Sequence, residues 1–151
     1  MQSLGDFFPE ENRSDLADDN FKVGAVLKYH MPFTNPPKEK RAIIVGFDAE
    51  KVLFALVLIN TAVNPRIFNT QELRDLHLQL EETGRPYLNH LSHVDCSQIF
   101  EQDIEQVKEI LKDSPGVHIG NVGPSDFENI REKISSATTI TPKLKRKYGF
   151  I

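Results

Sequence analysis

Hydrophobic side chains in the first half of the chain gather in short runs, and polar or turn-forming residues separate these runs. The three clearest runs cover residues 23–29, 42–47 and 52–59. Their length and their content of Val, Ile, Leu and Phe are typical of buried strands. The connections at 35–40 and 48–51 contain proline or charged residues. Because consecutive strands with such connections pair most easily with each other, we predict an antiparallel sheet.

The pattern changes after this sheet region. Residues 66–68 form a candidate short edge strand. Asn69 and Glu72 then have the spacing of a capping box, and leucines follow at helical intervals, which predicts a helix up to Gly84. A further extended segment is expected over residues 87–97.

The last third of the chain has the periodicity of helices. Apolar positions over residues 104–111 indicate an amphipathic helix that ends at 114–116. Pro124 suits the first turn of a second helix, whose apolar face is Phe127, Ile130 and Ile134. Residues 141–149 form a short basic turn. A β-rich body followed by helices predicts an α+β domain, or a small barrel with helical additions.

Composition narrows the class of protein. The chain has 151 residues, of which 39% are hydrophobic, and its single cysteine, Cys96, rules out a disulfide framework within the chain. No apolar run approaches the roughly 20 residues of a membrane helix, so we expect no membrane partner. The acidic N-terminus lacks the basic and then apolar order of a secretory signal, which favours a cytoplasmic location.

The net charge of −4 is unevenly distributed. Residues 1–20 hold six acidic side chains and one basic, residues 21–41 hold five basic and one acidic, and residues 143–147 hold four basic. The basic segments either bind phosphate together or only keep the protein in solution. The acidic N-terminal arm could cover a basic surface when nothing else does.

Four segments resemble the MazF/PemK toxin family, namely residues 22–27, 41–45, 57–61 and 93–99. Residues 88–100 together with 120–148 resemble the larger PemK-like proteins of bacteria and phages. The resemblance implies a small SH3-like antiparallel β-barrel (MazF/PemK/CcdB-like) with added C-terminal helices. It divides the chain into an acidic arm at 1–20, a barrel with an inserted helix at 21–100, and C-terminal helices with a basic tail at 101–151.

The resemblance also implies a function. Proteins of this family are metal-independent endoribonucleases of type II toxin–antitoxin systems, they commonly form homodimers, and an antitoxin protein holds them in check. The expected substrate is single-stranded RNA, and no cofactor is expected. Carried over to this sequence, Arg41 matches the family's catalytic arginine and Thr61 its catalytic Thr or Ser.

The chemistry of these residues fits part of such a reaction. When the 2′-hydroxyl of RNA attacks the adjacent phosphate, the planar fork of Arg41 can stabilise the phosphate and Thr61 can donate a hydrogen bond. Neither residue is a convincing general base. His30 is the nearest candidate general base in the sequence, although it also fits a strand-end histidine that faces water.

Other polar residues suggest binding rather than chemistry. The candidate RNA-binding residues are Lys28, Lys38, Lys40, Lys143, Lys145, Arg146 and Lys147. The last four also fit a basic helix end that binds its own carbonyls. His90, His93, Asp95 and Cys96 do not complete a zinc site, and we expect no metal.

Two further local interpretations concern the single cysteine and a glycine-containing segment. Cys96 is expected to be a buried structural thiol, and residues 95–97 to end a strand and prepare a helix cap. Residues 120–123 are expected to form a turn.

A second class of function stays open. The family's acidic residue after glycine is Ala25 here, and the proline that follows its arginine is Ala42. Both departures, together with the missing general base, fit a catalytically inactive SH3-like barrel that binds a peptide or a nucleic acid.

Overall fold

The computed structural model describes residues 21–151. The acidic arm expected at residues 1–20 lies outside the described residues.

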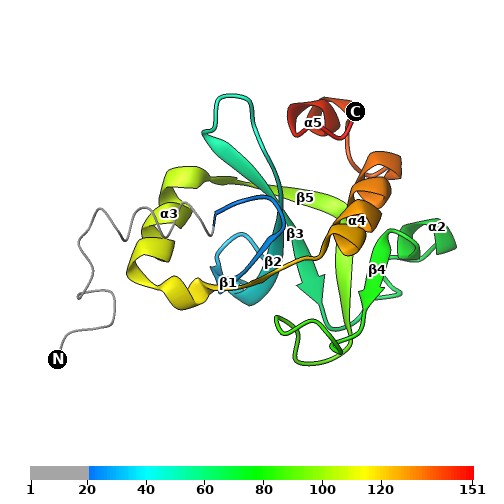
Figure 1. Cartoon of the computed structure of the whole chain (residues 1–151). Coiled ribbons are helices and arrows are strands. Elements are labelled where there is room, and N and C mark those ends of the chain that lie inside the picture. The colour runs from blue at the N-terminus through cyan, green and yellow to red at the C-terminus, as the bar shows by residue number, and fades with distance from the viewer. Residues whose placement is uncertain (1–20) are drawn as a thin grey trace.

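The centre of the fold is one six-stranded antiparallel sheet that curls into a half-barrel (Figure 1). Its strands pair in the order β4–β5–β3–β2–β1–β6, so β4 and β6 form its edges. In chain order the strands are β1 (Ala25–Met31), β2 (Lys38–Phe47), β3 (Leu53–Asn60), β4 (His77–Leu80), β5 (Ser92–Asp103) and β6 (His118–Asn121). The predicted α+β class with an antiparallel sheet and C-terminal helices is confirmed.

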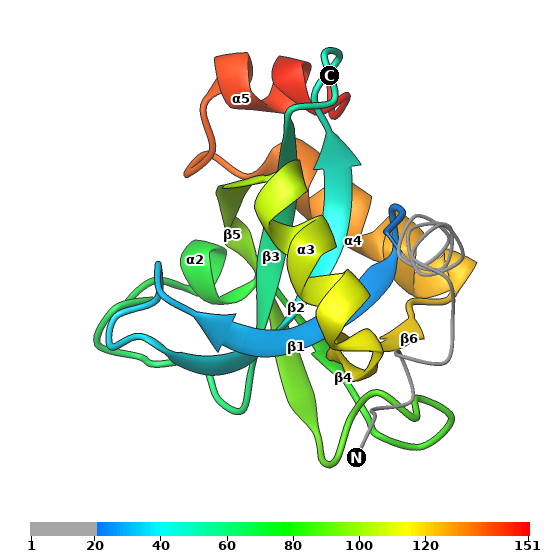
Figure 2. The same cartoon turned by 90° about the vertical axis from the view of Figure 1, so that its left-hand side faces the viewer.

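Short helices cover both faces of this sheet. In chain order they are α2 (Gln71–Arg74), α3 (Ile104–Asp113), the 3₁₀ turn η2 (Pro115–Val117), α4 (Pro124–Ser136) and α5 (Pro142–Lys147). Figure 2 shows α3 in front of the sheet and α4 behind it. None of the helices within residues 21–151 is long and apolar enough to cross a membrane.

The two faces of the sheet carry two separate hydrophobic clusters. Successive side chains of a strand point to opposite faces, so Leu56 and Leu58 of β3 belong to the cluster under α3, whereas Val57 and Ile59 belong to the cluster under α4. This explains why the sequence of β3 is continuously apolar rather than alternating.

The helices of the last third of the chain begin where their sequences predict. The side chain of Asp103 accepts a hydrogen bond from the backbone N–H of Gln106 and caps α3, and α4 begins at Pro124. Thr141 caps α5 in the same way through the N–H of Leu144. The predicted amphipathic helices at 104–111 and from Pro124 are confirmed, as is the basic turn.

The helix predicted from Asn69 to Gly84 is wrong. Thr70, not Asn69, caps the single turn α2, and the chain then becomes the edge strand β4. His77 to Leu80 pair with Asp95 to Ser92 of β5, and Leu76 and Leu80 are buried in the cluster under α4. The leucines fit strand periodicity as well as helix periodicity, and pairing with β5 decides between the two.

Four smaller expectations are also wrong. Residues 38–40, expected in the loop, are the first residues of β2 and pair with residues 29–31 of β1. Residues 66–68 form a turn, in which the N–H of Phe68 donates to the carbonyl of Asn64, rather than a strand. The glycine-rich segment expected to be a turn begins inside β6, where Gly120 pairs with Val26 of β1. Residues 95–97 lie within β5, which continues to Asp103.

Candidate functional site

An open depression of about 750 Å³ lies at the end of the sheet where β2 begins and β3 ends. The loop between β1 and β2 and the segment after β3 form two of its sides. Its polar lining includes Lys38, Lys40, Arg41, Asn60, Thr61, Asp95 and Gln98, and its aromatic lining consists of Phe33, Phe68 and Phe100. The rings of Phe33 and Phe100 are 5.1 Å apart and pack against the cluster under α3.

Strand alternation decides which way the basic residues of β2 point. Ala42 belongs to the cluster under α3 and Ile43 to the cluster under α4. Lys40 therefore points to the α3 side, whereas Arg41 points to the α4 side of the same edge. Both residues are half-buried and line the depression. The buried Nε of Arg41 has no hydrogen-bond partner among the described residues.

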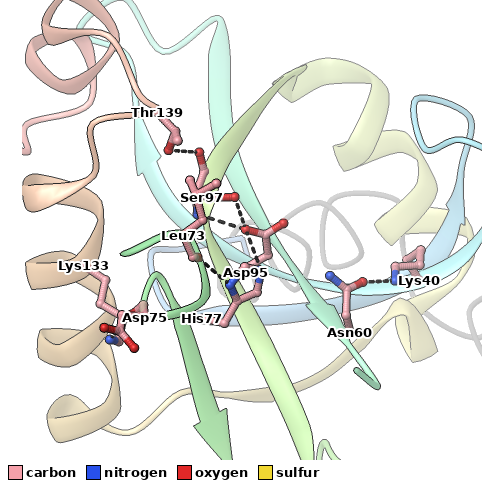
Figure 3. A network of polar contacts seen from close by, with 9 residues as sticks. All are labelled: Lys40, Asn60, Leu73, Asp75, His77, Asp95, Ser97, Lys133 and Thr139. Carbon is pink, nitrogen blue, oxygen red and sulfur yellow. Dashed lines mark hydrogen bonds and ion pairs between the residues drawn. The ribbon is translucent and has the colours of Figure 1, made fainter. Parts of the chain in front are cut away.

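Three neighbouring strands bring polar side chains together on the α3 side (Figure 3). The ammonium of Lys40 in β2 donates a hydrogen bond to Oδ1 of Asn60 in β3. Asp95 of β5 is opposite Leu58 in β3, two residues before Asn60. Its oxygen Oδ1 accepts hydrogen bonds from the backbone N–H of Ser97, at 2.9 Å, and from the Ser97 hydroxyl.

The edge strand β4 adds His77 to this network. Its Nδ1 is 3.2 Å from the carbonyl oxygen of Leu73, and because a carbonyl only accepts, Nδ1 carries a proton. Its Nε2 is 3.5 Å from Oδ1 of Asp95. The His77 side chain is 2% exposed, and the ring of Phe68 packs edge-on against it at 4.2 Å. The imidazole is thus fixed in orientation with Nε2 facing the carboxylate.

Asp95 keeps one carboxylate oxygen unoccupied. Its contacts with Ser97 and His77 all involve Oδ1. Figure 3 shows the other oxygen, Oδ2, directed away from Ser97, on the side where Lys40 and Asn60 lie. Within residues 21–151 no hydrogen bond to Oδ2 is found, and Asp95 lines the depression.

The electrostatics of the depression act on Lys40. Burial lowers the pKa of its ammonium, and the neighbouring charge of Lys38 lowers it further, whereas Asp95 partly opposes this effect. Lys40 is therefore more ready to give up a proton than an exposed lysine.

The other candidate residues from the sequence are distributed unevenly around this depression. Thr61 is exposed at its wall, directly after β3. His30 is exposed on β1 opposite Glu39 and does not line the depression. Nζ of Lys28, two residues earlier, lies 3.5 Å from Oε1 of Glu39.

The basic tail on α5 also lies outside the depression. The ammonium of Lys145 donates to the carbonyl of Ser135 at 2.7 Å, and that of Lys147 donates to Glu101 at 2.6 Å. Lys143 and Arg146 are not part of the lining either. At least two of the four basic side chains thus bind groups of the protein itself.

Sequence reasoning missed Asn60, His77, Asp95 and Ser97 as parts of one site. The signal available was a short polar segment within an apolar strand, at 95–97, beside a strand-like alternation at 76–80. Only the pairing of β4 with β5 brings these segments together.

The site is interpreted from its geometry, because neither a metal-binding arrangement within residues 21–151 nor a similar protein indicates its function. Within the described residues, no three His, Cys, Asp or Glu side chains are arranged to hold a metal ion. No protein-family model matches the chain, and no characterised protein matches it.

Proposed function

We propose that the protein is a PemK/MazF-like endoribonuclease that cuts single-stranded RNA without a metal ion. The observation that carries this proposal is the convergence of Lys38, Lys40, Arg41 and Thr61 on one depression. These residues come from the start of β2 and the end of β3, and they supply three positive charges and a hydroxyl. Such a set fits the phosphate backbone of a nucleic acid.

The proposed reaction is an attack of the RNA's own 2′-hydroxyl on the adjacent phosphorus. The bond from O2′ to phosphorus forms as the bond from phosphorus to O5′ breaks, which leaves a 2′,3′-cyclic phosphate and a 5′-hydroxyl end. The guanidinium of Arg41 and the hydroxyl of Thr61, which both line the depression, stabilise the charge on the phosphate oxygens. Binding groups of this kind contribute most when the charge develops in the transition state.

The aromatic lining supports a single-stranded substrate. Phe33, Phe68 and Phe100 are half-buried around the depression, so part of each ring is accessible to a ligand. Unpaired bases can stack on such rings, whereas the bases of a duplex are not accessible in this way.

The wider setting follows from the same resemblance. We propose that the half-barrel is a variant of the SH3-like barrel of the MazF/PemK family, that the protein acts as a cytoplasmic homodimer, and that an antitoxin protein inhibits it. Induced expression is then expected to arrest bacterial growth, and co-expression of the antitoxin to relieve the arrest.

The test is cleavage of a mixed-sequence RNA in EDTA, with detection of 2′,3′-cyclic phosphate ends. We expect Arg41→Ala to lower the cleavage rate by about 100-fold to 1000-fold, because it removes a stabiliser of the transition state. Arg131→Ala on α4, outside the depression, is the matched control and is expected to cut at the wild-type rate. Wild-type activity in Arg41→Ala contradicts the assignment of this site.

An inactive binding module is the second candidate function. Ile67 at the depression is 64% exposed, and an exposed apolar side chain beside aromatic rings also fits a peptide or a nucleic acid held without chemistry. RNA that binds in EDTA but stays intact supports this candidate over the enzyme.

A further inference from the structure

The proposed reaction needs one group to accept a proton and another to donate one, and neither Arg41 nor Thr61 suits the first role. An acceptor must have a free lone pair directed at the substrate, and a donor must have a spare proton near the leaving oxygen. The α3 side of the depression offers both, on strands that are two places apart in the sheet.

Asp95 has the properties of the acceptor. Its oxygen Oδ1 is held by two hydrogen bonds from Ser97, and His77 faces the same oxygen at 3.5 Å. The two hydrogen bonds from Ser97 fix the orientation of the carboxylate and leave Oδ2 directed toward the side of Lys40 and Asn60 (Figure 3). A carboxylate fixed through one oxygen and free at the other is preorganised to take a proton.

Lys40 has the properties of the donor. Its ammonium carries three protons, and the hydrogen bond to Asn60 uses one of them. The side chain lines the depression and points to the same face of the sheet as Asp95. Burial and Lys38 lower its pKa, which brings a lysine closer to the range in which a general acid is effective near neutral pH.

We infer that Asp95 and Lys40 are the proton-transferring pair of this site, an inference that rests on the proposed ribonuclease function. Oδ2 of Asp95 takes the proton of the 2′-hydroxyl as O2′ attacks phosphorus. The ammonium of Lys40 gives a proton to O5′ as the bond from phosphorus to O5′ breaks. Water afterwards removes the proton from Asp95 and returns one to Lys40, so both residues regain their starting state.

The remaining members of the network act as positioning residues. Ser97 holds the carboxylate of Asp95 through two hydrogen bonds, and Asn60 holds the ammonium of Lys40. The inference also gives Lys40 a role that differs from attraction of phosphate, and this difference can be tested.

The experiment uses the full-length protein, two variants and two RNA substrates. Asp95→Asn keeps the shape of the side chain and its acceptor oxygen but removes the base. Lys40→Arg keeps the positive charge but replaces the donor with a group that hardly gives up a proton. The second substrate has sulfur in place of the bridging 5′ oxygen at the cut site, and a thiolate leaves without protonation.

With ordinary RNA, we expect each variant to cut about 100-fold to 10,000-fold more slowly than the wild type while the RNA affinity changes little. With the sulfur substrate, we expect Lys40→Arg to approach the wild-type rate and Asp95→Asn to remain slow. The inference is overturned if Asp95→Asn cuts ordinary RNA at the wild-type rate, or if the sulfur substrate fails to restore Lys40→Arg.

The outcome also separates this inference from the proposed function. A wild-type protein that cuts neither substrate rejects both, whereas an active wild type with an active Asp95→Asn rejects only the pair. If Asp95→Asn does not fold, Ser97→Ala replaces it, because it removes the hydroxyl that holds Oδ1. Its kcat is then expected to fall about 10-fold at unchanged KM, and an unchanged kcat rejects Asp95 as the base.

Discussion

Asp95 is a polar residue between two buried apolar neighbours in the same strand, and its side chain needs hydrogen bonds there. Its neighbours Val94 and Cys96 point into the cluster under α4 and are fully buried, whereas Asp95 points to the other face, at the depression. A carboxylate that is 12% exposed requires hydrogen bonds, and Ser97 supplies two from the same strand. Hydrogen bonds within residues 95–97 thus satisfy Oδ1 of Asp95 and leave Oδ2 for a ligand.

The thiol of Cys96, next to this carboxylate, is expected to be unreactive in the folded protein. Burial raises the pKa of Cys96 to about 12, with the charge of Asp95 adding to the effect, and the side chain is 0% exposed. At pH 8 we expect maleimide to label the native protein about 1000-fold more slowly than the unfolded protein, because so little thiolate is present. Mass spectrometry with and without denaturant measures the two rates, and equally fast labelling contradicts the buried position.

At the scale of elements, the close packing of the C-terminal segment against β2 fixes where α5 lies. A Cβ added to Gly46 would lie 3.1 Å from Cβ of Tyr148 and 3.2 Å from its carbonyl oxygen. The hydroxyl of Tyr148 donates to Glu101 of β5 at 2.7 Å, and Lys147 binds the same carboxylate. The basic tail is therefore attached to the sheet through its aromatic and charged side chains, away from the depression.

Gly46→Ala is expected to lower the free energy of unfolding by about 1–3 kcal/mol, because one of the two contacting backbones must shift to admit the methyl group. Urea unfolding followed by circular dichroism measures this change. Gly116→Ala is the control, since a Cβ there meets no atom within 4 Å. A destabilisation no larger than that of the control contradicts the packing of Tyr148 against β2.

At the scale of the whole molecule, one sheet is shared by two hydrophobic clusters. Every strand from β1 to β3 contributes side chains to both clusters, with Val26 and Leu27 of β1 as one example. Helices α3 and α4 cover opposite faces of this sheet (Figure 2). Loss of packing on one face therefore weakens the support of the other, and the domain is expected to unfold as a single unit.

Ile130→Ala on α4 is expected to lower the free energy of unfolding by about 2–5 kcal/mol, because the side chain is fully buried. Leu111→Ala on α3 is expected to act similarly from the other face. Far-UV circular dichroism and tyrosine fluorescence, which reports Tyr29 under α3 as well as Tyr87 and Tyr148 under α4, are expected to give coincident transitions. Separate transitions would show that the two faces unfold independently.

The sequence by itself determined those elements whose signal is local. Apolar runs indicated β3 and the apolar parts of β1 and β2, apolar periodicity indicated α3, and Pro124 with apolar periodicity indicated α4. The resemblance to MazF/PemK toxins predicted Arg41 and Thr61 as catalytic residues, and the charge pattern predicted Lys38 and Lys40 as RNA-binding residues.

Only the tertiary structure decided the elements whose sequence fits more than one structure. Residues 77–80 form a strand because they pair with β5. Residues 118–121 form a strand because they pair with β1. The same pairing brought His77 to Asp95, and strand alternation brought Lys40 to the same face. Hydrogen bonds between strands join residues that are far apart in the chain, and no local pattern specifies such partners.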